Sequence, residues 1–553
     1  MAKFDHVDKF PELPISTMST LDVERTGEWR NMKPILVEKT APCTNQCPAK
    51  ILLPHYFHLL NEDKLEEAAK IFLLNNPFPS ITGRVCPHFC EQHCNRKDYD
   101  SSVSIRALER FLGDAVSKLE LDKPGKDTGK KIVVIGSGPA GLTCAYYLRL
   151  AGHQVTILEK MLKPGGLLRY GIPEYRLPNT IVDQEIARLE KMGIEFKMNI
   201  ELGKNVTLDS LKSDYYAVFV ATGAWGERAM DLDGENLTNR GLPFLIDLEK
   251  NKKTLTGKRC AVIGGGNTAI DVARSLLRLG AEVTVLYRRT EAEMPAITEE
   301  YQKAVAEGVL FHFLLQPMAI KKNENTLKIT LEKMQLGEAD QSGRRRPEPT
   351  GETLKMEFDT IFRAIGEISE LKAFPDAMKD ETSWLKVDKN GATTDNKIFA
   401  GGDMVTGPAT VIEAIAMGRK AAFAISSKLG NEIPIHPWIF EISDKIVTHE
   451  EINTAYFPKT KCNKEHELAP DTRVKAGFAE ESATITAIEA KNEISRCFSC
   501  GHCNQCGTCY VFCPDLAVNW PGPKFNYDYC KGCGICAAEC PGNVIDFIPE
   551  EES

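Results

Sequence analysis

The 553-residue sequence predicts a multidomain α/β protein, and two observations support this fold class. A strand, a glycine-rich turn, a helix and a second strand follow one another twice, first from Lys131 and again from Lys258. Such a unit is typical of a Rossmann-like domain that binds a dinucleotide. Ten cysteines also lie within the 44 residues from Cys497 to Cys540, a density that indicates metal ligation. A chain of this length is too long for one hydrophobic core.

The composition excludes several classes of function. The chain is 42% hydrophobic and 26% charged, which is ordinary for a soluble globular protein. Its net charge of -9 argues against nucleic acid as a partner. The first ten residues lack a secretory signal, and no run approaches the roughly 18–20 apolar residues of a membrane span. We therefore expect a cytoplasmic protein, in whose reducing compartment the 18 cysteines bind metal rather than form disulfides.

Residues 1–125 are predicted to be helical with short loops. The stretch from Leu60 to Pro77 has apolar residues at helical spacing and ends at the proline. A polar stretch rich in Lys, Gly and Asp then forms a linker to the first βαβ unit. Zinc is the alternative to an iron–sulfur cluster for the cysteine spacings of this region. Its five cysteines are Cys43, Cys47, Cys86, Cys90 and Cys94.

The first glycine loop, Gly136-x-Gly138-x-x-Gly141, follows the strand KIVVI and opens a helix. Its glycines permit a tight turn and a close approach of the backbone to a pyrophosphate, which the helix N-terminus favours. Glu159 ends the next strand, where a carboxylate accepts hydrogen bonds from ribose hydroxyls. The sequence thus predicts a dinucleotide site with an acidic ribose contact.

The second loop, Gly264-x-Gly266-x-x-Ala269, has the same context, but its second strand ends in Arg288 and Arg289. A carboxylate there would repel a 2′-phosphate, whereas guanidinium groups bind it with two hydrogen bonds. The site therefore favours NADPH over NADH; the alternative is that the two arginines simply face solvent.

Two other segments are predicted to be peripheral. Residues 335–354 form a polar hairpin or loop within the second nucleotide domain, and their three arginines are interpreted as surface charge. Residues 431–492 are punctuated by prolines and form a connector that wraps other domains.

The C-terminal cysteines form two runs, Cys503-x2-Cys506-x2-Cys509-x3-Cys513 and Cys530-x2-Cys533-x2-Cys536-x3-Cys540, each followed by proline. In this spacing the fourth thiolate of each run serves the other 4Fe–4S cluster. Residues 493–553 are therefore predicted to form an α+β two-cluster ferredoxin domain. From Cys497 onward there are seven acidic and two basic residues. This skew indicates either a solvated surface or an acidic face that steers a basic redox partner.

Several segments resemble, in fixed order, the glutamate synthase small-subunit family, which includes the flavin half of dihydropyrimidine dehydrogenase and subunits of NAD(P)H:ferredoxin transhydrogenase. Besides the two loops, these segments are GGLLRYGIPEYRLP, the ATG at 221–223 and FAGGDMVTGPATVIEAI. The resemblance covers about residues 40–430. It implies an FAD-binding domain of residues 130–256 and 367–430 that is interrupted by an NAD(P)H-binding domain of residues 257–366.

The resemblance also implies site residues. FAD would contact Gly136, Gly138, Pro139, Ala140, Gly141, Glu159, Lys160, Gly166, Leu167, Arg176, Thr222, Gly223, Gly402, Asp403 and Thr410. The nicotinamide nucleotide would contact Gly264, Gly265, Gly266, Asn267, Thr268, Arg288, Arg289, Ala364 and Gly366. No side-chain acid or base is nominated, because the cofactors carry the chemistry.

That family holds two clusters in its N-terminal domain. The resemblance implies that the cluster near the flavin binds to Cys47, Cys86, Cys90 and Glu109. The family's outer cluster uses a CxxC just before the first cysteine, but here no cysteine precedes Cys43. The ferredoxin runs leave one CxxC unused, so we expect a joint site, within a chain or across a homodimer, of Cys43, Cys94, Cys497 and Cys500. Sixteen ligands would then serve four 4Fe–4S clusters. We expect Cys144 and Cys260 simply to pack, and Cys462 has no assigned role.

Together these features predict an NAD(P)H:acceptor oxidoreductase that serves a ferredoxin or another iron–sulfur protein. The joined ferredoxin and the phrase RCFSCGHCNQC resemble the oxidoreductase associated with dissimilatory sulfite reductase, which implies a role in sulfur metabolism. Similar chains accompany 2-oxoacid:ferredoxin and aromatic-CoA systems, which stay open as alternative settings. Two alternatives stay open: a glutamate synthase small subunit that serves an amidotransferase, and a non-enzymatic electron relay. A flavin disulfide reductase is excluded, because no redox cysteine pair follows the first βαβ unit.

Overall fold

The computed structural model describes residues 25–116, 118–119, 123–250, 257–339, 343–382, 384–433 and 443–550. The chain forms two compact units. The cysteine-rich unit consists of Met1–Leu121, Ile435–Glu465 and Thr484–Ser553, and the two-sheet unit consists of Asp122–Pro434 and His466–Ala483. No described helix is both long and apolar enough to cross a membrane. The first ten residues, in which we predict no secretory signal, lie outside the described part of the chain.

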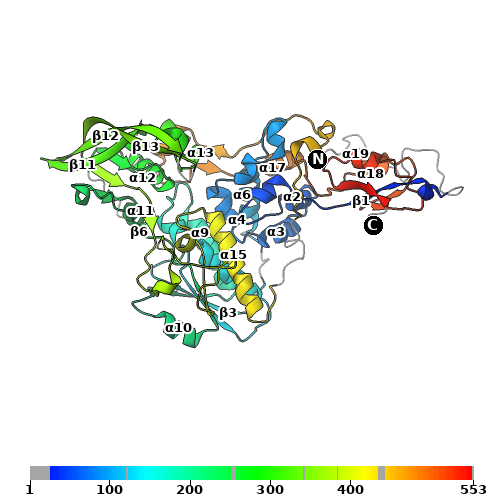
Figure 1. The fold of residues 1–553 in the computed structure, drawn as a ribbon, viewed down its shortest axis with the longest axis horizontal. Coiled ribbons are helices and arrows are strands. Elements are labelled where there is room, and N and C mark those ends of the chain that lie inside the picture. The colour runs from blue at the N-terminus through cyan, green and yellow to red at the C-terminus, as the bar shows by residue number, and fades with distance from the viewer. Residues whose placement is uncertain are drawn as a thin grey trace. The chain divides into compact units, whose positions relative to one another are not determined.

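The first parallel sheet of the two-sheet unit has the strand order β16-β5-β2-β3-β4. Its strands are β2 (Lys131–Ile135), β3 (Gln154–Glu159), β4 (Glu195–Met198), β5 (Ala217–Val220) and β16 (Ile398–Ala400). The apolar runs of β2 and β5 are buried, which is typical of a parallel sheet covered by helices. α15 (Val411–Lys428), yellow in Figure 1, packs against α7 (Pro139–Leu150). A Cβ on Gly418 would lie 2.2 Å from the Ala140 carbonyl oxygen, so the two backbones are in direct contact.

The second parallel sheet has the order β10-β9-β8-β14-β7. Its strands are β7 (Asn239–Arg240), β8 (Arg259–Ile263), β9 (Glu282–Tyr287), β10 (Leu310–Phe313) and β14 (Thr360–Arg363). The chain leaves the first sheet after β5 and returns to it at β16, so the second Rossmann-like domain is inserted in the first, as predicted. The predicted boundary at residue 257 is too late, because β7 and α11 (Gly241–Glu249) already belong to this domain. Leu245 and Leu248 of α11 pack in its core, and no glycine loop marks this earlier start.

A three-stranded antiparallel sheet covers one side of the second domain. It consists of β11 (Leu315–Asn323), β12 (Thr326–Ala339) and β13 (Arg345–Phe358). Ile320, Ile329 and Leu331 pack in one core with residues of the second parallel sheet. The predicted polar hairpin of residues 335–354 is confirmed as the β12–β13 hairpin, in which Gln335 lies opposite Glu348. Its residues 340–342 lie outside the described residues.

The cysteine-rich unit begins with short helices, as predicted. They are α1 (Pro42–Gln46), α2 (Leu53–Asn61), α3 (Leu65–Leu73), α4 (Pro79–Val85), α5 (Phe89–Gln92) and α6 (Ile105–Val116). α3 ends before Pro77, where the helical pattern stops. α4 and α6 touch through their backbones, since a Cβ on Gly83 would lie 2.5 Å from the Arg110 nitrogen and one on Gly113 would lie 2.3 Å from the Ser80 nitrogen. α17 (Ala487–Ser495) packs against α2 and α6.

The N-terminal region is not entirely helical, which corrects the prediction. β1 (Met32–Leu36), dark blue in Figure 1, pairs antiparallel with the red C-terminal strand β21 (Ile545–Pro549). Pro34 argues against a central strand, but it is tolerated here because β1 has only one neighbouring strand. The ferredoxin-like region therefore includes residues from both ends of the chain. Its other elements are α18 (Thr508–Val511), β19 (Val518–Asn519), β20 (Lys524–Phe525) and α19 (Ile535–Ala538).

The predicted connector, residues 431–492, divides between the two units. Residues 466–483 belong to the two-sheet unit, where α16 (Pro470–Lys475) lies against α12 (Asn267–Arg278) and α13 (Thr298–Glu307). The Arg473 Nε lies 3.0 Å from Glu307 Oε1, and Glu307 also pairs with Arg274; all three side chains are buried. Residues 434–442 of the connector lie outside the described residues.

Candidate flavin, nucleotide and iron–sulfur sites

The first glycine loop, between β2 and α7, leaves open space at its middle glycine. A Cβ on Gly138 would meet nothing within 4 Å, whereas one on Gly136 would lie 2.3 Å from the Ala221 oxygen. A Cβ on Gly141 would lie 2.0 Å from the Gly136 oxygen. The outer glycines thus permit close packing, and Gly138 leaves room for a ligand. α7 begins at Pro139, so a helix N-terminus that favours anionic groups directly follows the open glycine.

Three segments from elsewhere in the two-sheet unit meet this loop. A Cβ on Gly166 would lie 2.7 Å from Gly138 Cα, and one on Gly402 would lie 3.1 Å from Ala140 Cβ. The third segment is the ATG, because the carbonyl oxygen beside Gly136 is that of Ala221. The next residue, Thr222, accepts a hydrogen bond from Trp225 Nε1 at 2.8 Å through its carbonyl oxygen. Leu167 begins α8 (Leu167–Tyr170), and Gly223 has a φ of 70°.

Glu159 ends β3 beside the loop and is 3% exposed. Its Oε2 accepts hydrogen bonds from the Ser137 nitrogen at 2.9 Å and from the Ser137 hydroxyl at 2.5 Å. The Met161 nitrogen donates to Oε1 at 2.8 Å. The neighbouring Lys160 ammonium lies 4.6 Å from the centroid of the Trp225 ring. The carboxylate is thus held at the loop, where we predict a ribose contact.

Asp403 and Thr410 lie at the starts of α14 (Asp403–Thr406) and α15. Burial raises the pKa of the Asp403 carboxyl to about 7; the hydrogen bond from the Ala409 nitrogen opposes this shift, and Glu367 and Glu413 add to it. Thr410 caps α15, and its hydroxyl donates to Glu413 Oε2 at 2.6 Å. The polar partners of Asp403 in the structure therefore do not fully stabilise its charged form against burial, as expected of a carboxyl group at a ligand site.

Arg176 has a different contact from the one that the resemblance implies. Its Nη1 donates to both carboxylate oxygens of Asp271, at 2.8 and 2.7 Å, and its Nε lies 3.1 Å from Glu300 Oε2. All three residues are buried. The structure therefore engages Arg176 in an ion pair with α12 and α13, and its proposed contact with FAD stays a prediction.

The second loop repeats the geometry of the first. A Cβ on Gly266 would meet nothing within 4 Å, whereas one on Gly264 would lie 2.1 Å from the Ala364 oxygen. Asn267 Oδ1 accepts a hydrogen bond from the Ile297 nitrogen at 2.9 Å, and the Thr268 hydroxyl donates to Glu367 Oε1 at 2.8 Å. Gly366, on the loop after β14, has a φ of 120°. The middle glycine again leaves room for a ligand.

The two predicted arginines follow β9 directly. Arg288 is exposed, and Arg289 is 7% exposed. The Arg289 Nε donates to the carbonyl oxygen of Arg345 at 2.8 Å. Arg345 is one of the three arginines that we interpreted as surface charge, so the structure brings it to the second site.

The first thiol group of the cysteine-rich unit consists of Cys47, Cys86 and Cys90, all buried. Burial, together with the nearby Cys86 and Glu109, raises the pKa of the Cys47 thiol to about 11. Cys47 ends α1 and Cys86 ends α4, while Cys90 lies on the short helix α5. The structure thus brings these three thiols and the carboxylate together.

Polar side chains that sequence reasoning missed hold Glu109. His88 Nε2 lies 3.2 Å from Glu109 Oε2, and the Thr82 hydroxyl and the Asn76 amide donate to Oε1, the amide at 3.4 Å. The other His88 nitrogen lies 2.7 Å from the Cys86 carbonyl oxygen. Their position near Cys86 and Cys90 in the sequence is the one signal that could have indicated these residues.

The structure also brings together Cys43, Cys94, Cys497 and Cys500. Burial raises the pKa of the Cys43 thiol well above its ordinary value, and the other three cysteines raise it further. Asn95 donates to Cys500 Sγ at 3.5 Å. Cys43 and Cys500 belong to one apolar cluster with Phe457 and Phe498. Four thiols from segments some 400 residues apart thus lie in one place within a single chain; their role as ligands stays a prediction.

Buried ion pairs hold these distant segments together. Arg496 is 1% exposed and donates to Glu493 Oε1 at 2.5 Å, to Asp100 Oδ1 at 3.1 Å and to the Ser101 carbonyl oxygen at 2.7 Å. Arg96, also 1% exposed, donates to the carbonyl oxygen of Arg496. These contacts fix residues 493–500 against residues 96–104.

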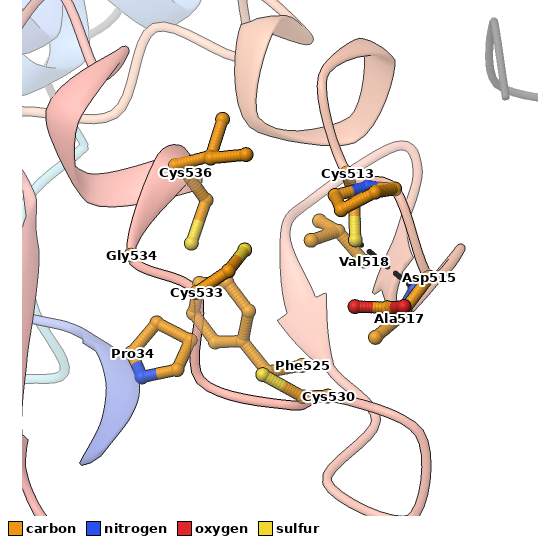
Figure 2. Close-up of a pocket in the computed structure, with 12 residues that line it drawn as sticks. Pro34, Cys513, Asp515, Ala517, Val518, Phe525, Cys530, Cys533, Gly534 and Cys536 are labelled. Atoms are coloured by element: carbon orange, nitrogen blue, oxygen red, sulfur yellow. Dashed lines mark hydrogen bonds between the residues drawn. The ribbon is translucent and has the colours of Figure 1, made fainter. Parts of the chain in front are cut away.

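The ferredoxin runs surround two hollows. One is lined by Cys513, Cys530, Cys533 and Cys536, and Figure 2 shows their sulfur atoms around it. The other is lined by Cys503, Cys506, Cys509 and Cys540. The fourth cysteine of each run thus lies with the first three of the other, which is the arrangement of a two-cluster ferredoxin. Backbone nitrogens also contact sulfur, for example Ala517 N to Cys513 Sγ at 3.2 Å.

Basic residues from other segments offset much of the acidic skew at the C-terminus. Asp546 pairs with Lys39 at 2.7 Å and with Lys445 at 2.8 Å. Glu550 pairs with Arg30 at 2.7 Å. A count over the C-terminal segment alone therefore overstates the negative charge of this surface.

The remaining cysteines have ordinary surroundings. Cys144 and Cys260 are fully buried in α7 and β8, as predicted. Cys462 is partly buried in the connector, and the structure gives it no role.

Three family models match the chain. Residues 130–418 match pyridine nucleotide-disulphide oxidoreductase, and residues 36–121 match dihydropyrimidine dehydrogenase domain II, 4Fe-4S cluster. Residues 523–546 match the 4Fe-4S binding domain. The two glycine loops fall within the first match, and the N-terminal cysteines fall within the second.

Curated relatives agree with these models. The chain is 35% identical to the β subunit of NADPH-Fe(3+) oxidoreductase of Geobacter sulfurreducens, over 85% of this chain and 76% of the relative. It is 36% identical to the β subunit of NADP(+)-dependent formate dehydrogenase of Moorella thermoacetica, over 83% and 70%. It is also 36% identical to the glutamate synthase [NADPH] small chain of Escherichia coli K12, over 70% and 88%.

The fold and the sites define an iron–sulfur flavoprotein that acts as an NAD(P)H oxidoreductase. The chain belongs to the pyridine nucleotide-disulphide oxidoreductase family, in the branch that carries an N-terminal 4Fe–4S domain. It has no redox cysteine pair after the first βαβ unit. Its cofactors are FAD, NADPH and 4Fe–4S clusters, and the open glycine loops and grouped thiols fit them.

Proposed function

We propose that this chain moves electrons between NADPH and an iron–sulfur protein partner or a ferredoxin, through FAD and four 4Fe–4S clusters. One observation carries the proposal. Four groups of potential ligands, each with three or four cysteines, lie in one compact unit of a chain whose other unit has two dinucleotide loops. A nucleotide that carries electron pairs is thereby joined to centres that carry single electrons.

The side chains of the protein bind and orient these groups. When bound, FAD supplies the exchange between electron pairs and single electrons. Gly138 would admit its pyrophosphate, Glu159 would accept hydrogen bonds from its ribose, and Asp403 would contact the flavin part of the molecule. Glu109, held by His88 and Thr82, would be the fourth ligand of the cluster that includes Cys47.

The names of two relatives support NADPH as the preferred nucleotide and a protein as the partner. One is an NADPH-Fe(3+) oxidoreductase and the other an NADP(+)-dependent formate dehydrogenase, and both are named as β subunits. Arg288 and Arg289 at the end of β9 fit a 2′-phosphate, because guanidinium groups bind a phosphate with two hydrogen bonds. A sulfite reductase is a candidate partner, because residues 496–506 resemble the oxidoreductase associated with dissimilatory sulfite reductase.

A glutamate synthase small subunit remains the second candidate. The relative of that name supports it. The two additional ferredoxin runs favour the first candidate, because they provide two further single-electron centres at the C-terminal end of the chain.

The test uses full-length protein prepared without oxygen. NADPH should bleach the flavin absorbance, and the reduced protein should then reduce a ferredoxin or the iron–sulfur protein that is recovered with it. Iron should approach about sixteen atoms per chain, as four cubanes require. Bleaching by NADPH should need a lower concentration than bleaching by NADH.

Each alternative has its own outcome. Failure of both nucleotides to bleach the flavin would favour the electron relay. Recovery with an amidotransferase subunit would favour the glutamate synthase role. Iron clearly below about sixteen atoms per chain would contradict the four-cluster scheme.

A further inference from the structure

Residues 290–297 form a wall beside the second glycine loop. The Ala296 nitrogen donates to the Gly265 oxygen at 3.2 Å, and the Tyr287 hydroxyl donates to the Glu293 carbonyl oxygen at 2.9 Å. The Tyr287 ring occupies the space that a Cβ on Gly265 would need, at 2.5 Å. These contacts place Glu293 close to the loop that would hold the nucleotide.

An arginine from a distant strand reaches this wall. Arg345 begins β13, and its Nε and Nη2 lie 2.7 and 2.6 Å from Glu293 Oε1. Glu293 is 6% exposed, and Thr290 holds its other oxygen through the backbone nitrogen at 3.3 Å and through the hydroxyl. The hydrogen bond from Thr290 lowers the pKa of Glu293, and Arg345 lowers it further. The Arg345 side chain is therefore fixed by a buried, charged acceptor.

Arg345 also determines how Arg289 is oriented. The Arg289 Nε donates to the Arg345 carbonyl oxygen at 2.8 Å, and the Leu314 nitrogen donates to the Arg289 carbonyl oxygen at 3.2 Å. The Arg345 side chain itself is 52% exposed. The end of β9, where a 2′-phosphate binds in a Rossmann-like domain, thus lies beside a third guanidinium group.

We propose that Arg345 is a specificity-determining residue for NADPH, and that the β12–β13 hairpin carries it to the 2′-phosphate. Arg288, Arg289 and Arg345 together with Glu293 give a net charge of about +2, which matches the roughly -1.5 to -2 of a phosphate monoester at pH 7. NADH lacks that phosphate, so Arg345 should not contribute to the affinity for NADH. This inference rests on the proposal that the second loop binds the nicotinamide nucleotide.

The same hairpin offers a matched control. Arg346 is exposed and follows Arg345 on the strand, so its side chain leaves the opposite face of the sheet. Replacing either arginine by glutamine removes one positive charge from the same segment. Only the change at residue 345 should affect the 2′-phosphate.

The experiment compares wild type, Arg345→Gln, Arg345→Lys and Arg346→Gln as full-length, cofactor-loaded proteins. We expect Arg345→Gln to lower kcat/KM for NADPH about tenfold, or about 1.4 kcal/mol, and to leave kcat/KM for NADH unchanged. Arg345→Lys should recover part of the loss, because it keeps the charge but not the paired hydrogen bonds. Arg346→Gln should match wild type. Calorimetric binding of 2′,5′-ADP should weaken in Arg345→Gln, while binding of 5′-AMP should not.

The failures are distinguishable. Equal losses for NADPH and NADH, or equal effects of the two glutamine variants, would overturn the assignment of Arg345 and leave the proposed function intact. Unchanged binding of 2′,5′-ADP in Arg345→Gln would overturn it as well. If neither nucleotide reduces the wild-type flavin, the proposed function fails, and this inference fails with it.

Discussion

The hollow lined by Cys513, Cys530, Cys533 and Cys536 and the thiol group of Cys43, Cys94, Cys497 and Cys500 are built in different ways. In the first, three of four cysteines lie within seven residues of each other, and short turns bring their sulfur atoms together. In the second, the two halves are about 400 residues apart in sequence, and Arg96 and Arg496 hold them in place. The first group depends on local spacing and the second on the rest of the fold.

This difference has an energetic consequence. Closing a long loop costs conformational entropy before any contact forms, although that cost grows only slowly with length. A metal centre that joins distant segments therefore contributes directly to folding, because its ligands are not preassembled in the unfolded chain. A local cysteine run affects mainly its own turn.

The largest effect is expected for the double variant Cys497→Ser and Cys500→Ser. It should lose about four of about sixteen iron atoms per chain and should also release residues 487–500 from residues 94–104. Hydrogen–deuterium exchange should rise in both segments. The matched control is Cys530→Ser and Cys533→Ser, which should lose a similar amount of iron but raise exchange only between residues 503 and 545. If both double variants alter the same segments, the contrast between the two groups is wrong.

The next largest effect is expected for Arg496→Met. This variant tests whether buried ion pairs, in addition to any bound metal, bring the thiols of Cys43, Cys94, Cys497 and Cys500 together. Removing this guanidinium leaves the buried Glu493 without its cation, which costs about 3–5 kcal/mol, whereas Asp100 keeps its ion pair with Arg96. Exchange of residues 95–104 should rise even in protein that keeps its iron.

Lys491→Met is the control for Arg496→Met, because Lys491 pairs with Asp63 at 3.0 Å while both side chains are more than half exposed. Such a pair contributes only about 0–1 kcal/mol. Similar exchange in the two variants would show that the buried ion pairs do not hold the site.

The smallest effect is expected at the flavin site. There, Gly138 belongs to a continuous glycine motif, whereas Asp403 comes from a segment far away in the sequence. The pKa of Asp403 is raised to about 7 by burial, so the folded protein without FAD binds a proton that the unfolded chain has released. Ionisation of Asp403 should therefore destabilise the FAD-free protein progressively from about pH 4 to about pH 7, by about 3 kcal/mol. In Asp403→Asn this part of the pH dependence should disappear. Urea unfolding of the FAD-free wild type and Asp403→Asn at pH 5 and pH 8 measures this dependence. An equal change in the free energy of unfolding in both proteins would show that Asp403 does not cause it.

The parts of the site that are continuous in sequence could be predicted without the structure. Gly138 and Gly266 stand in strand–loop–helix units, and the ferredoxin cysteines stand in fixed spacings, because local geometry alone requires these residues. The strand of residues 32–36, the early start of the second nucleotide domain and the contact of Arg176 with Asp271 could not be predicted. Each depends on a partner that only the folded chain brings near.

The sequence by itself determined the family, the two nucleotide loops and the pairs of cysteine runs. The sequence also has one CxxC, Cys497 and Cys500, that the ferredoxin runs do not use, and one N-terminal cluster that lacks two ligands. The joint thiol group could be inferred from this mismatch. Only the tertiary structure decided that Cys43 and Cys500 meet within one chain, that His88 holds Glu109, and that Arg345 reaches the end of β9. The reason is physical: a motif records what neighbouring residues must do together, whereas contacts between distant segments follow from packing and charge pairing across the whole fold.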